Sequence, residues 1–265
     1  MPSLIDIKDL SKTDILEIWE SVGNVIPVSA DVAWSFEGNG IRTRATFVQA
    51  FQKLGANYVE LPNFLKTNES VEDLAGYMDP YFSLYVIRDS NHERLEMFAK
   101  ATDKPVINAM SSRAHPCEVL TDAYYLSTKF SNLEGLKILL WGPVTNVYRS
   151  WHSLTEVLNL DVTHYCPNNY QAENNSIKYT DNISGEFDVV ITDAWVSGFS
   201  DKKYCLNEEY LEQLGNPMIL PTPPVTVGNE LDKPISEFKT FAGYKQKSLL
   251  LPVQMAIISH LLRVS

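Results

Sequence analysis

Residues 31–47 read DVAWSFEGNGIRTRATF and predict a strand, a glycine turn and a helix in direct succession. The segment 31–36 is largely apolar, which is typical of a buried strand. Gly38 and Gly40 supply the turn, and apolar positions then recur at intervals of three and four up to Leu54, as on one face of a helix. Because units of a strand followed by a helix build parallel sheets, this stretch indicates an α/β fold.

The start of this helix carries positive charge. Arg42 and Arg44 lie in its first turn, where positive side chains oppose the helix dipole. The same end of a helix binds anions, because its first N–H groups have no partner within the helix and guanidinium groups add bidentate hydrogen bonds. We therefore interpret Gly40–Arg44 as an oxyanion site. The alternative is a solvated helix start with incidental arginines.

Strand-like and helix-like segments alternate over almost the whole chain, which predicts an α/β protein with parallel sheets. The expected strands are residues 31–36, 56–60, 82–87, 105–108, 136–141, 161–165, 187–192 and 217–220. The expected helices are residues 10–20, 43–54, 70–77, 91–101, 116–128, 147–158, 207–214 and 248–262. The pattern breaks at residues 128–135, and we expect a domain boundary there.

Length and charge narrow the class of protein. With 265 residues, 45% of them hydrophobic, the chain is long enough for one large domain or two small ones. Its net charge of −11 argues against nucleic acid or an anionic membrane as a partner, because both require a basic surface. The three cysteines form neither a zinc motif nor a disulfide framework, and the N-terminus does not resemble a signal peptide. These features predict a cytoplasmic protein.

Further candidate residues follow the expected strands of the first half. Arg88 ends an apolar strand at a point where it is able to meet the same anion as Arg42, although alone it is equally a surface charge. His115 precedes Pro116, which suits the first helical position, so His115 is expected at the N-cap, where a neutral ring donates one hydrogen bond. Glu118 either takes part in the site or is a capping-box partner.

The second half offers weaker candidates. Asn146 follows a glycine turn, and Asp193 and Ser197 follow a strand, but each is equally explained as a cap or turn residue. The proline-rich loop at 217–234 directly follows another strand, so it is a candidate wall of a site. The chain has no dinucleotide turn, Walker motif or H-E-x-x-H pair, and we expect no cofactor and no metal ion. The remaining histidines lack ligand spacing and are interpreted as structural: His92, His152, His164 and His260.

In their order along the chain, these elements resemble the aspartate/ornithine carbamoyltransferase family. Gly40–Arg44 matches the S-T-R-T-R phosphate motif, and Glu69–Ala75 resembles the E-S-x-x-D-T-A segment. His115–Glu118 matches H-P-x-Q, and Asp193–Ser197 matches the start of D-x-W-x-S-M-G in the ornithine branch. The likeness runs over most of the chain and includes Arg88 and the final helix.

This resemblance implies two parallel-sheet α/β domains with the active site in the cleft between them. Residues 1–130, with the final helix 248–265, are expected to bind carbamoyl phosphate, and residues 131–247 the second substrate. The implied ligands of carbamoyl phosphate are Gly40, Ile41, Arg42, Thr43, Arg88 and His115. Catalytic roles are implied for His115, Arg42, Thr43 and Glu118. The implied ligands of an amino-acid-like amine are Asn146, Asp193, Ser197, Thr222 and Pro223. The family pattern also implies a homotrimer in which the Phe64–Ser70 loop completes a neighbouring site.

Several positions depart from the family pattern. Gly40 and Ile41 replace two hydroxyl residues, and Glu118 replaces a glutamine that contacts the carbamoyl amide. A carboxylate at this position is able to accept from the carbamoyl NH₂, but it also repels the neighbouring phosphate. Because burial beside an anion raises a carboxyl pKa, the other interpretation is a protonated Glu118 that imitates the glutamine. On the acceptor side, Gly198 replaces methionine, Pro221–Pro224 replaces H-C-L-P, and Leu250 stands at a late arginine.

These departures predict a divergent carbamoyltransferase whose acceptor is not ornithine. Two alternatives stay open. The first is a non-catalytic family member that binds a phosphate metabolite or an amino acid for regulation or assembly. The second is transfer of a different acyl or amidino group, which Glu118 would favour by pairing with a more cationic donor.

Overall fold

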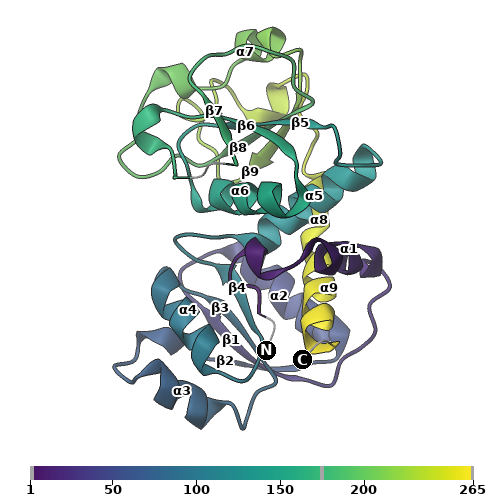
Figure 1. Ribbon diagram of the computed structural model, residues 1–265, viewed down its shortest axis with the longest axis vertical. Coiled ribbons are helices and arrows are strands. Elements are labelled where there is room, and N and C mark those ends of the chain that lie inside the picture. The colour runs from purple at the N-terminus through teal and green to yellow at the C-terminus, as the bar shows by residue number, and fades with distance from the viewer. Residues whose placement is uncertain (1–2, 174–175, 264–265) are drawn as a thin grey trace. The chain divides into compact units, whose positions relative to one another are not determined.

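The computed structural model describes residues 3–173 and 176–263. The chain forms two compact units, each built on its own parallel sheet (Figure 1). Unit 1 comprises residues 1–124 and 246–265, and unit 2 comprises residues 125–245. The chain changes unit twice, within helix α5 (Pro116–Lys129) and at the start of α8 (Lys245–Ser248).

Unit 1 contains a four-stranded parallel sheet in the order β2-β1-β3-β4. Its strands are β1 (Asp31–Phe36), β2 (Asn57–Glu60), β3 (Leu84–Arg88) and β4 (Val106–Met110). Its helices are α1 (Lys12–Ser21), α2 (Ile41–Leu54), α3 (Val71–Met78), α4 (His92–Ala101), the first part of α5, and α9 (Leu250–Arg263). The central strands β1 and β3 are buried along most of their length, which explains why their sequences are apolar runs rather than alternating patterns.

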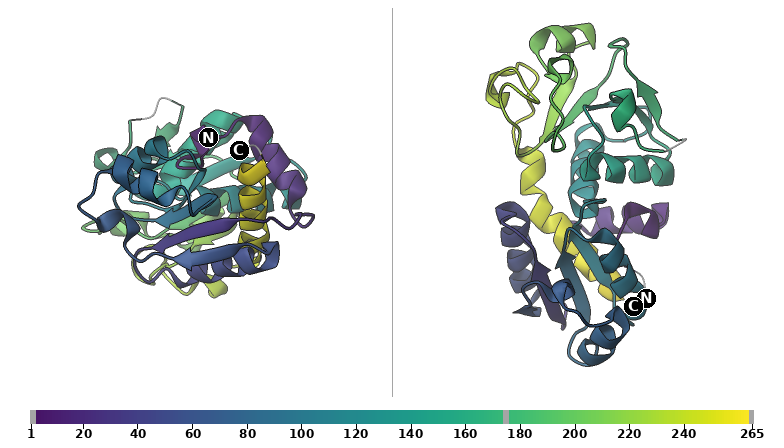
Figure 2. Two further views of the ribbon diagram at one scale, coloured as in Figure 1. Left: turned by 90° about the horizontal axis from the view of Figure 1, so that it is seen from below. Right: turned by 90° about the vertical axis from the view of Figure 1, so that its left-hand side faces the viewer.

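The C-terminal helix α9 is part of the N-terminal unit. It packs against α1 and α2, and its yellow ribbon runs beside them in Figures 1 and 2. Its buried side chains include Val253, Gln254 and the unbroken run Ala256–Leu261, so the helix is covered around most of its circumference. Segments 3–124 and 246–263 therefore build unit 1 together. Residues 264–265 of the expected final helix lie outside the described residues.

Unit 2 contains a five-stranded parallel sheet in the order β7-β6-β5-β8-β9. Its strands are β5 (Lys137–Trp141), β6 (Asp161–Tyr165), β7 (Lys178–Thr180), β8 (Val189–Asp193) and β9 (Met218–Thr222). Its main helices are α6 (Asn146–Leu158) and α7 (Glu208–Gln213), together with the second part of α5. One core cluster combines aliphatic side chains with the aromatic rings of Trp141, Tyr165, Tyr204 and Phe238.

The predicted fold class is confirmed, because both units are parallel-sheet α/β structures. Every expected strand overlaps an observed one, and β1 agrees at both ends. The sequence does not predict β7, since a strand of three residues is too short to show a periodic pattern. Within residues 3–173 and 176–263, no helix is long and apolar enough to cross a bilayer.

Candidate functional site

The predicted anion residues of unit 1 lie where the strand order of its sheet reverses. The chain runs from β1 outward to β2 and then crosses back to β3, so the carboxyl ends of β1 and β3 form a topological switch point. Phe36, the last residue of β1, is paired in register with Arg88, the last residue of β3. In open α/β sheets, ligands bind in the crevice outside such strand ends.

Helix α2 begins directly after this point without a capping side chain. Gly40 is its N-cap residue and makes no side-chain hydrogen bond to the helix, in contrast to Ser70 at α3 and Asn91 at α4. The first N–H groups of a helix have no acceptor within it, and the positive end of the dipole lies there too. The start of α2 therefore has the features of an anion-binding helix end.

Arg88 is held against the start of α2. Its guanidinium carbon lies 4.9 Å from the centroid of the Phe36 ring. A Cβ atom added to Gly40 would overlap that guanidinium group and would lie 2.9 Å from Cζ of Phe36. Burial lowers the pKa of Arg88, with nearby Arg42 adding to the effect and Glu37 opposing it. Two cationic side chains, Arg42 and Arg88, therefore act at one helix start.

The second arginine of the motif has an acidic partner in unit 1. Arg44 forms a salt bridge with Glu60 of β2, and its guanidinium carbon lies 5.3 Å from the centroid of the Phe36 ring. Of the other motif residues, Ile41 is exposed and Thr43 is buried. The charge of Arg44 is thus compensated within the protein.

His115 lies at the start of α5, after β4, and its carbonyl accepts the first helical hydrogen bond from the Val119 N–H at 3.3 Å. Its side chain is buried. Burial lowers the pKa of His115 to about 4, and Arg88, Lys247 and Arg42 favour the same direction while Glu118 opposes it. The ring is therefore neutral at physiological pH, so one nitrogen is able to donate a hydrogen bond to a ligand oxygen.

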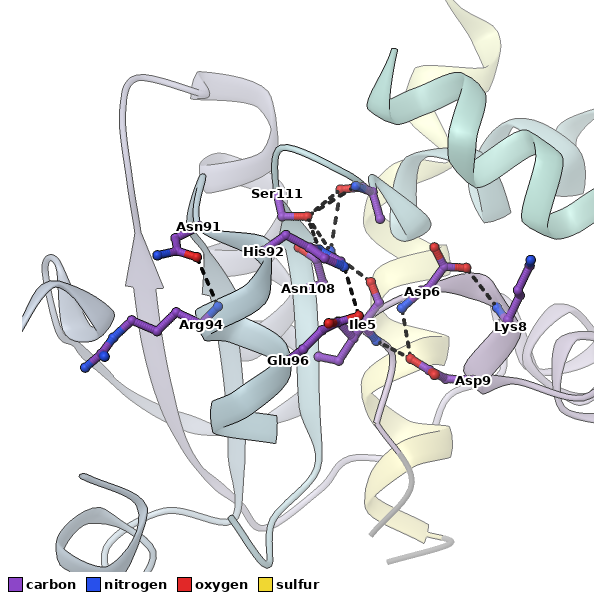
Figure 3. A network of polar contacts seen from close by, with 11 residues as sticks. Ile5, Asp6, Lys8, Asp9, Asn91, His92, Arg94, Glu96, Asn108 and Ser111 are labelled. Atoms are coloured by element: carbon purple, nitrogen blue, oxygen red, sulfur yellow. Dashed lines mark hydrogen bonds and ion pairs between the residues drawn. The ribbon is translucent and has the colours of Figure 1, made fainter. Parts of the chain in front are cut away.

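A polar network fixes the turn that leads from β4 to His115 (Figure 3). Asn108 donates from Nδ2 to the Ile5 carbonyl at 2.9 Å and to Oγ of Ser111 at 3.1 Å. The same Oγ accepts from the Ala114 N–H at 3.2 Å and lies 2.7 Å from Nδ1 of His92. This arrangement agrees with a structural role for His92, since Ser111 is buried inside the turn.

Glu118 has a partner that the sequence does not indicate. Its Oε1 accepts a hydrogen bond from Nζ of Lys247 in α8, and the same ammonium donates to Oδ1 of Asp122 at 3.0 Å. Burial raises the pKa of Glu118, but Lys247 and Arg42, together with other nearby groups, outweigh burial and hold the pKa below its usual range. The expectation of a protonated Glu118 is therefore wrong, because the buried carboxylate has a buried cation beside it. In a capping box, the Glu118 side chain would accept from the N-cap backbone N–H, whereas its observed hydrogen-bond partner is Lys247.

The Phe64–Ser70 loop is tied to its own chain. Lys66 lies 3.0 Å from Oε1 of Glu37 and 3.2 Å from Oδ1 of Asp89, and both carboxylates follow strand ends of the same sheet. Arg94 donates from Nε to the Leu65 carbonyl at 2.6 Å and from Nη2 to the Glu69 carbonyl at 2.8 Å. The loop thus has a defined conformation within unit 1.

The predicted residues of unit 2 also follow strand ends at a switch point, here between β5 and β8. Asn146 begins α6 after β5, and its Oδ1 accepts from the Val147 N–H at 3.0 Å. Asp193 ends β8 and is paired in register with Thr222, which ends β9. The Tyr148 hydroxyl lies within hydrogen-bond distance of both central strands, 2.7 Å from the Trp141 carbonyl of β5 and 3.1 Å from the Ile191 carbonyl of β8. The sheet therefore brings these strand ends to one edge.

The loops beyond these strands are braced by a residue that the sequence analysis missed. Glu230 accepts from the Trp195 N–H at 2.6 Å and from the Thr226 N–H at 2.7 Å, which joins the loops after β8 and β9. Ser197 is exposed in the turn after Trp195, whereas Thr222 is buried. No sequence motif marks Glu230, because its role depends on two loops distant in the sequence. Among residues 3–173 and 176–263, no three His, Cys, Asp or Glu side chains group as metal ligands do.

Comparison with known proteins gives one consistent result. Residues 3–128 match the family model described as "Aspartate/ornithine carbamoyltransferase, carbamoyl-P binding domain". The chain is 26% identical over 300 aligned positions to an ornithine carbamoyltransferase of Methanococcus maripaludis, with 97% of this chain and 98% of the relative covered. It is 28% identical to one of Geobacter metallireducens, covering 88% of this chain and 86% of the relative. The crystal structure of an ornithine carbamoyltransferase from Burkholderia thailandensis has the same fold, with a TM-score of 0.89 at 22% identity over 99% of both chains.

Proposed function

Since the chain belongs to the aspartate/ornithine carbamoyltransferase family, we propose that it transfers the carbamoyl group of carbamoyl phosphate to the amine of an amino-acid-like acceptor. The observation that carries this proposal is the pair of cations, Arg42 and Arg88, at the uncapped start of α2, with neutral His115 in the same electrostatic neighbourhood. A doubly charged phosphate suits the arginines and the helix amides. A carbonyl oxygen suits the single N–H that neutral His115 offers.

In the proposed reaction, the nitrogen lone pair of the acceptor forms a bond to the carbonyl carbon. The bond from that carbon to the bridging oxygen then breaks, and phosphate leaves with the electron pair. The proton lost by the amine is taken up by the departing phosphate. Arg42 and Arg88 stabilise the charge that grows on the leaving group, and His115 and Thr43 polarise the carbonyl. Catalysis of this kind depends on donors fixed in advance, which helix amides and a buried imidazole provide.

We assign recognition of the acceptor to unit 2. Asp193 is suited to an α-ammonium group, and Asn146 and Ser197 are suited to an α-carboxylate. Thr222 ends β9 and Pro223 follows it, and we assign these two uncharged residues to the wall of the acceptor site. Such a wall supplies no charged partner for a side-chain ammonium, and this supports an acceptor other than ornithine.

Turnover is tested with the full-length protein, carbamoyl phosphate and a panel of amines that includes ornithine, aspartate and neutral amino acids. Phosphate release above a control without protein is expected with at least one amine. Release with ornithine alone would overturn the proposed acceptor but keep the reaction. No amine-dependent release, together with clear thermal stabilisation by phosphate, would replace the proposal with the non-catalytic alternative, a regulatory or assembly protein that binds a phosphate metabolite or an amino acid.

The phosphate site is tested by substitution of its arginines. Arg42→Ala is expected to weaken phosphate binding by at least tenfold, because it removes a charge-assisted hydrogen bond donor from the helix start. Arg44→Ala is the matched control, since the Arg44 charge is paired with Glu60, and its phosphate affinity should stay within about twofold of the wild type. Isothermal titration with inorganic phosphate measures both. Equal affinities of the two variants would remove Arg42 from the site.

We further propose a cytoplasmic homotrimer. Free thiols at Cys117, Cys166 and Cys205 support a reducing compartment. The trimer rests on the family pattern for the Phe64–Ser70 loop. Light scattering coupled to size-exclusion chromatography measures the mass in solution, and a mass of one chain would contradict the trimer.

A further inference from the structure

Two buried carboxylates in unit 1 share one lysine. Glu118 and Asp122 lie one helical turn apart on α5, and both contact Nζ of Lys247. The side chains of Glu118, Asp122 and Lys247 are 9%, 0% and 13% exposed. An unpaired charge at such depth is strongly unfavourable, so the three groups are stable as one charged set.

The two oxygens of Glu118 have different surroundings. Oε1 accepts from Lys247, whereas Oε2 lies 4.0 Å from Nε2 of His115, beyond hydrogen-bond distance. An ionised carboxylate only accepts hydrogen bonds, whereas a side-chain amide both donates and accepts. With Lys247 fixed on Oε1, the side of Glu118 that faces His115 presents an acceptor and no donor.

We propose that Lys247 is a positioning residue, which holds Glu118 as an acceptor-only carboxylate and thereby selects phosphate ligands that carry an N–H group on their carbonyl carbon. An amide NH₂ donates to such an oxygen, a methyl group does not, and a carboxylate is repelled. This inference rests on the proposed function, because it places the ligand carbonyl beside His115.

The surrounding charges are consistent with this role. Lys247 contacts both carboxylates, Arg42 acts on Glu118 and on His115, and Arg88 acts on His115. These cations suit a phosphate, while the carboxylate oxygen of Glu118 suits a hydrogen-bond donor next to it. A simple clamp between α5 and α8 would account for the salt bridges but predicts no preference between ligands.

Binding of two stable phosphonates distinguishes the positioning role of Lys247 from a simple clamp between α5 and α8. Phosphonoacetamide and 2-oxopropylphosphonate have the same carbonyl and phosphonate groups and differ in NH₂ against CH₃. Isothermal titration with the full-length wild type should show the amide bound about tenfold more tightly or better, as for a hydrogen bond to a charged group. The preference should stay constant from pH 6 to 8, because Lys247 keeps Glu118 ionised throughout.

Glu118→Gln tests the orientation that Lys247 imposes. The Lys247–Asp122 pair remains, so the fold is expected to persist, and the ammonium attracts the amide oxygen of the new glutamine. Its NH₂ group then faces the ligand, and the preference for the amide phosphonate should fall to within about twofold of none. In the triple variant Glu118→Gln/Asp122→Asn/Lys247→Met all three charges are removed together. The glutamine is then free to turn, and part of the preference should return.

Each outcome bears on the proposal. Equal binding of the two phosphonates by the wild type, or an undiminished preference in Glu118→Gln, overturns the role of Lys247 and leaves the phosphate site intact. A preference in the triple variant no greater than in Glu118→Gln also overturns it. Binding of neither phosphonate overturns this inference together with the proposed function.

Discussion

At the scale of single residues, Gly40 determines where Arg88 lies. The guanidinium group occupies the space that a Cβ atom at residue 40 would need, and the Phe36 ring closes the other side. Glycine is therefore required by a close approach of side chains and not by its own backbone, whose φ of −59° is ordinary. The family motif has a hydroxyl residue at this position. In this chain glycine stands there instead, and the Arg88 guanidinium occupies the space that a side chain at residue 40 would need.

Gly40→Ala is accordingly expected to displace the Arg88 guanidinium and to weaken phosphate binding by about tenfold, as for a lost charge-assisted contact. Gly76→Ala is the matched control, because Gly76 lies in the exposed face of α3 and a Cβ there meets no atom within 4 Å. The control should keep its phosphate affinity and gain slightly in melting temperature. Titration calorimetry and thermal unfolding measure the two effects. Unchanged affinity in Gly40→Ala would show that Arg88 reaches phosphate from another position.

Residue-level interpretation from sequence was possible where the chemistry involves neighbouring residues, and it missed contacts between residues distant in the chain. Gly40–Arg44 could be interpreted from neighbouring residues alone, because a helix start and its charges are contiguous. Lys247 could not, since 129 positions separate it from Glu118 in the chain. The pKa of Glu118 was predicted in the wrong direction for the same reason, because burial was considered without the cation that accompanies it.

At the scale of elements, periodicity located the strands that carry the candidate residues. Both sheets show why strand ends were informative, since parallel strands bring residues distant in sequence to one edge, as with Asp193 and Thr222. The loops between these ends were harder to predict, because bracing contacts such as that of Glu230 with Trp195 leave no periodic signal.

The contact between α6 and β6 predicts sensitivity to acid. His152 on α6 lies 3.0 Å from Nδ1 of His164 on β6, and Nε2 of His164 lies 2.9 Å from the Gly142 carbonyl. Burial, with His152 adding to it, holds the pKa of His164 well below its usual 6.5. Below pH 6.5 the unfolded state binds more protons than the folded state. The free energy of unfolding is therefore highest above pH 6.5 and decreases as the pH falls below 6.5, by up to about 1.4 kcal/mol per pH unit.

His164→Gln removes this titration and keeps a donor for the Gly142 carbonyl. When the pH falls from 7.5 to 5.5, the variant is expected to lose less protection against hydrogen exchange than the wild type. Hydrogen exchange of peptides from α6 and β6 measures the effect within unit 2, after correction for the intrinsic pH dependence of exchange. An equal loss of protection in both proteins would assign the acid sensitivity to other groups.

At the scale of the whole molecule, unit 1 is discontinuous in sequence, and this predicts how it responds to truncation. A chain that ends at Leu249 lacks α9 and exposes the apolar faces of α1 and α2. Phosphate binding should be lost, and proteolysis should concentrate in residues 3–124 while unit 2 stays protected. Limited proteolysis with mass spectrometry measures the pattern. Retained phosphate affinity in the truncated chain would contradict a structural role for α9.

The same discontinuity reverses the usual order of events on the ribosome. Domains generally fold as they emerge, beginning with the N-terminal one. Here residues 125–245 are complete while the first half still waits for α9 and for the Lys247 ammonium group that contacts Glu118 and Asp122. The half synthesised first is thus the last to fold, and for most of translation its nascent segments present the apolar surface that chaperones bind.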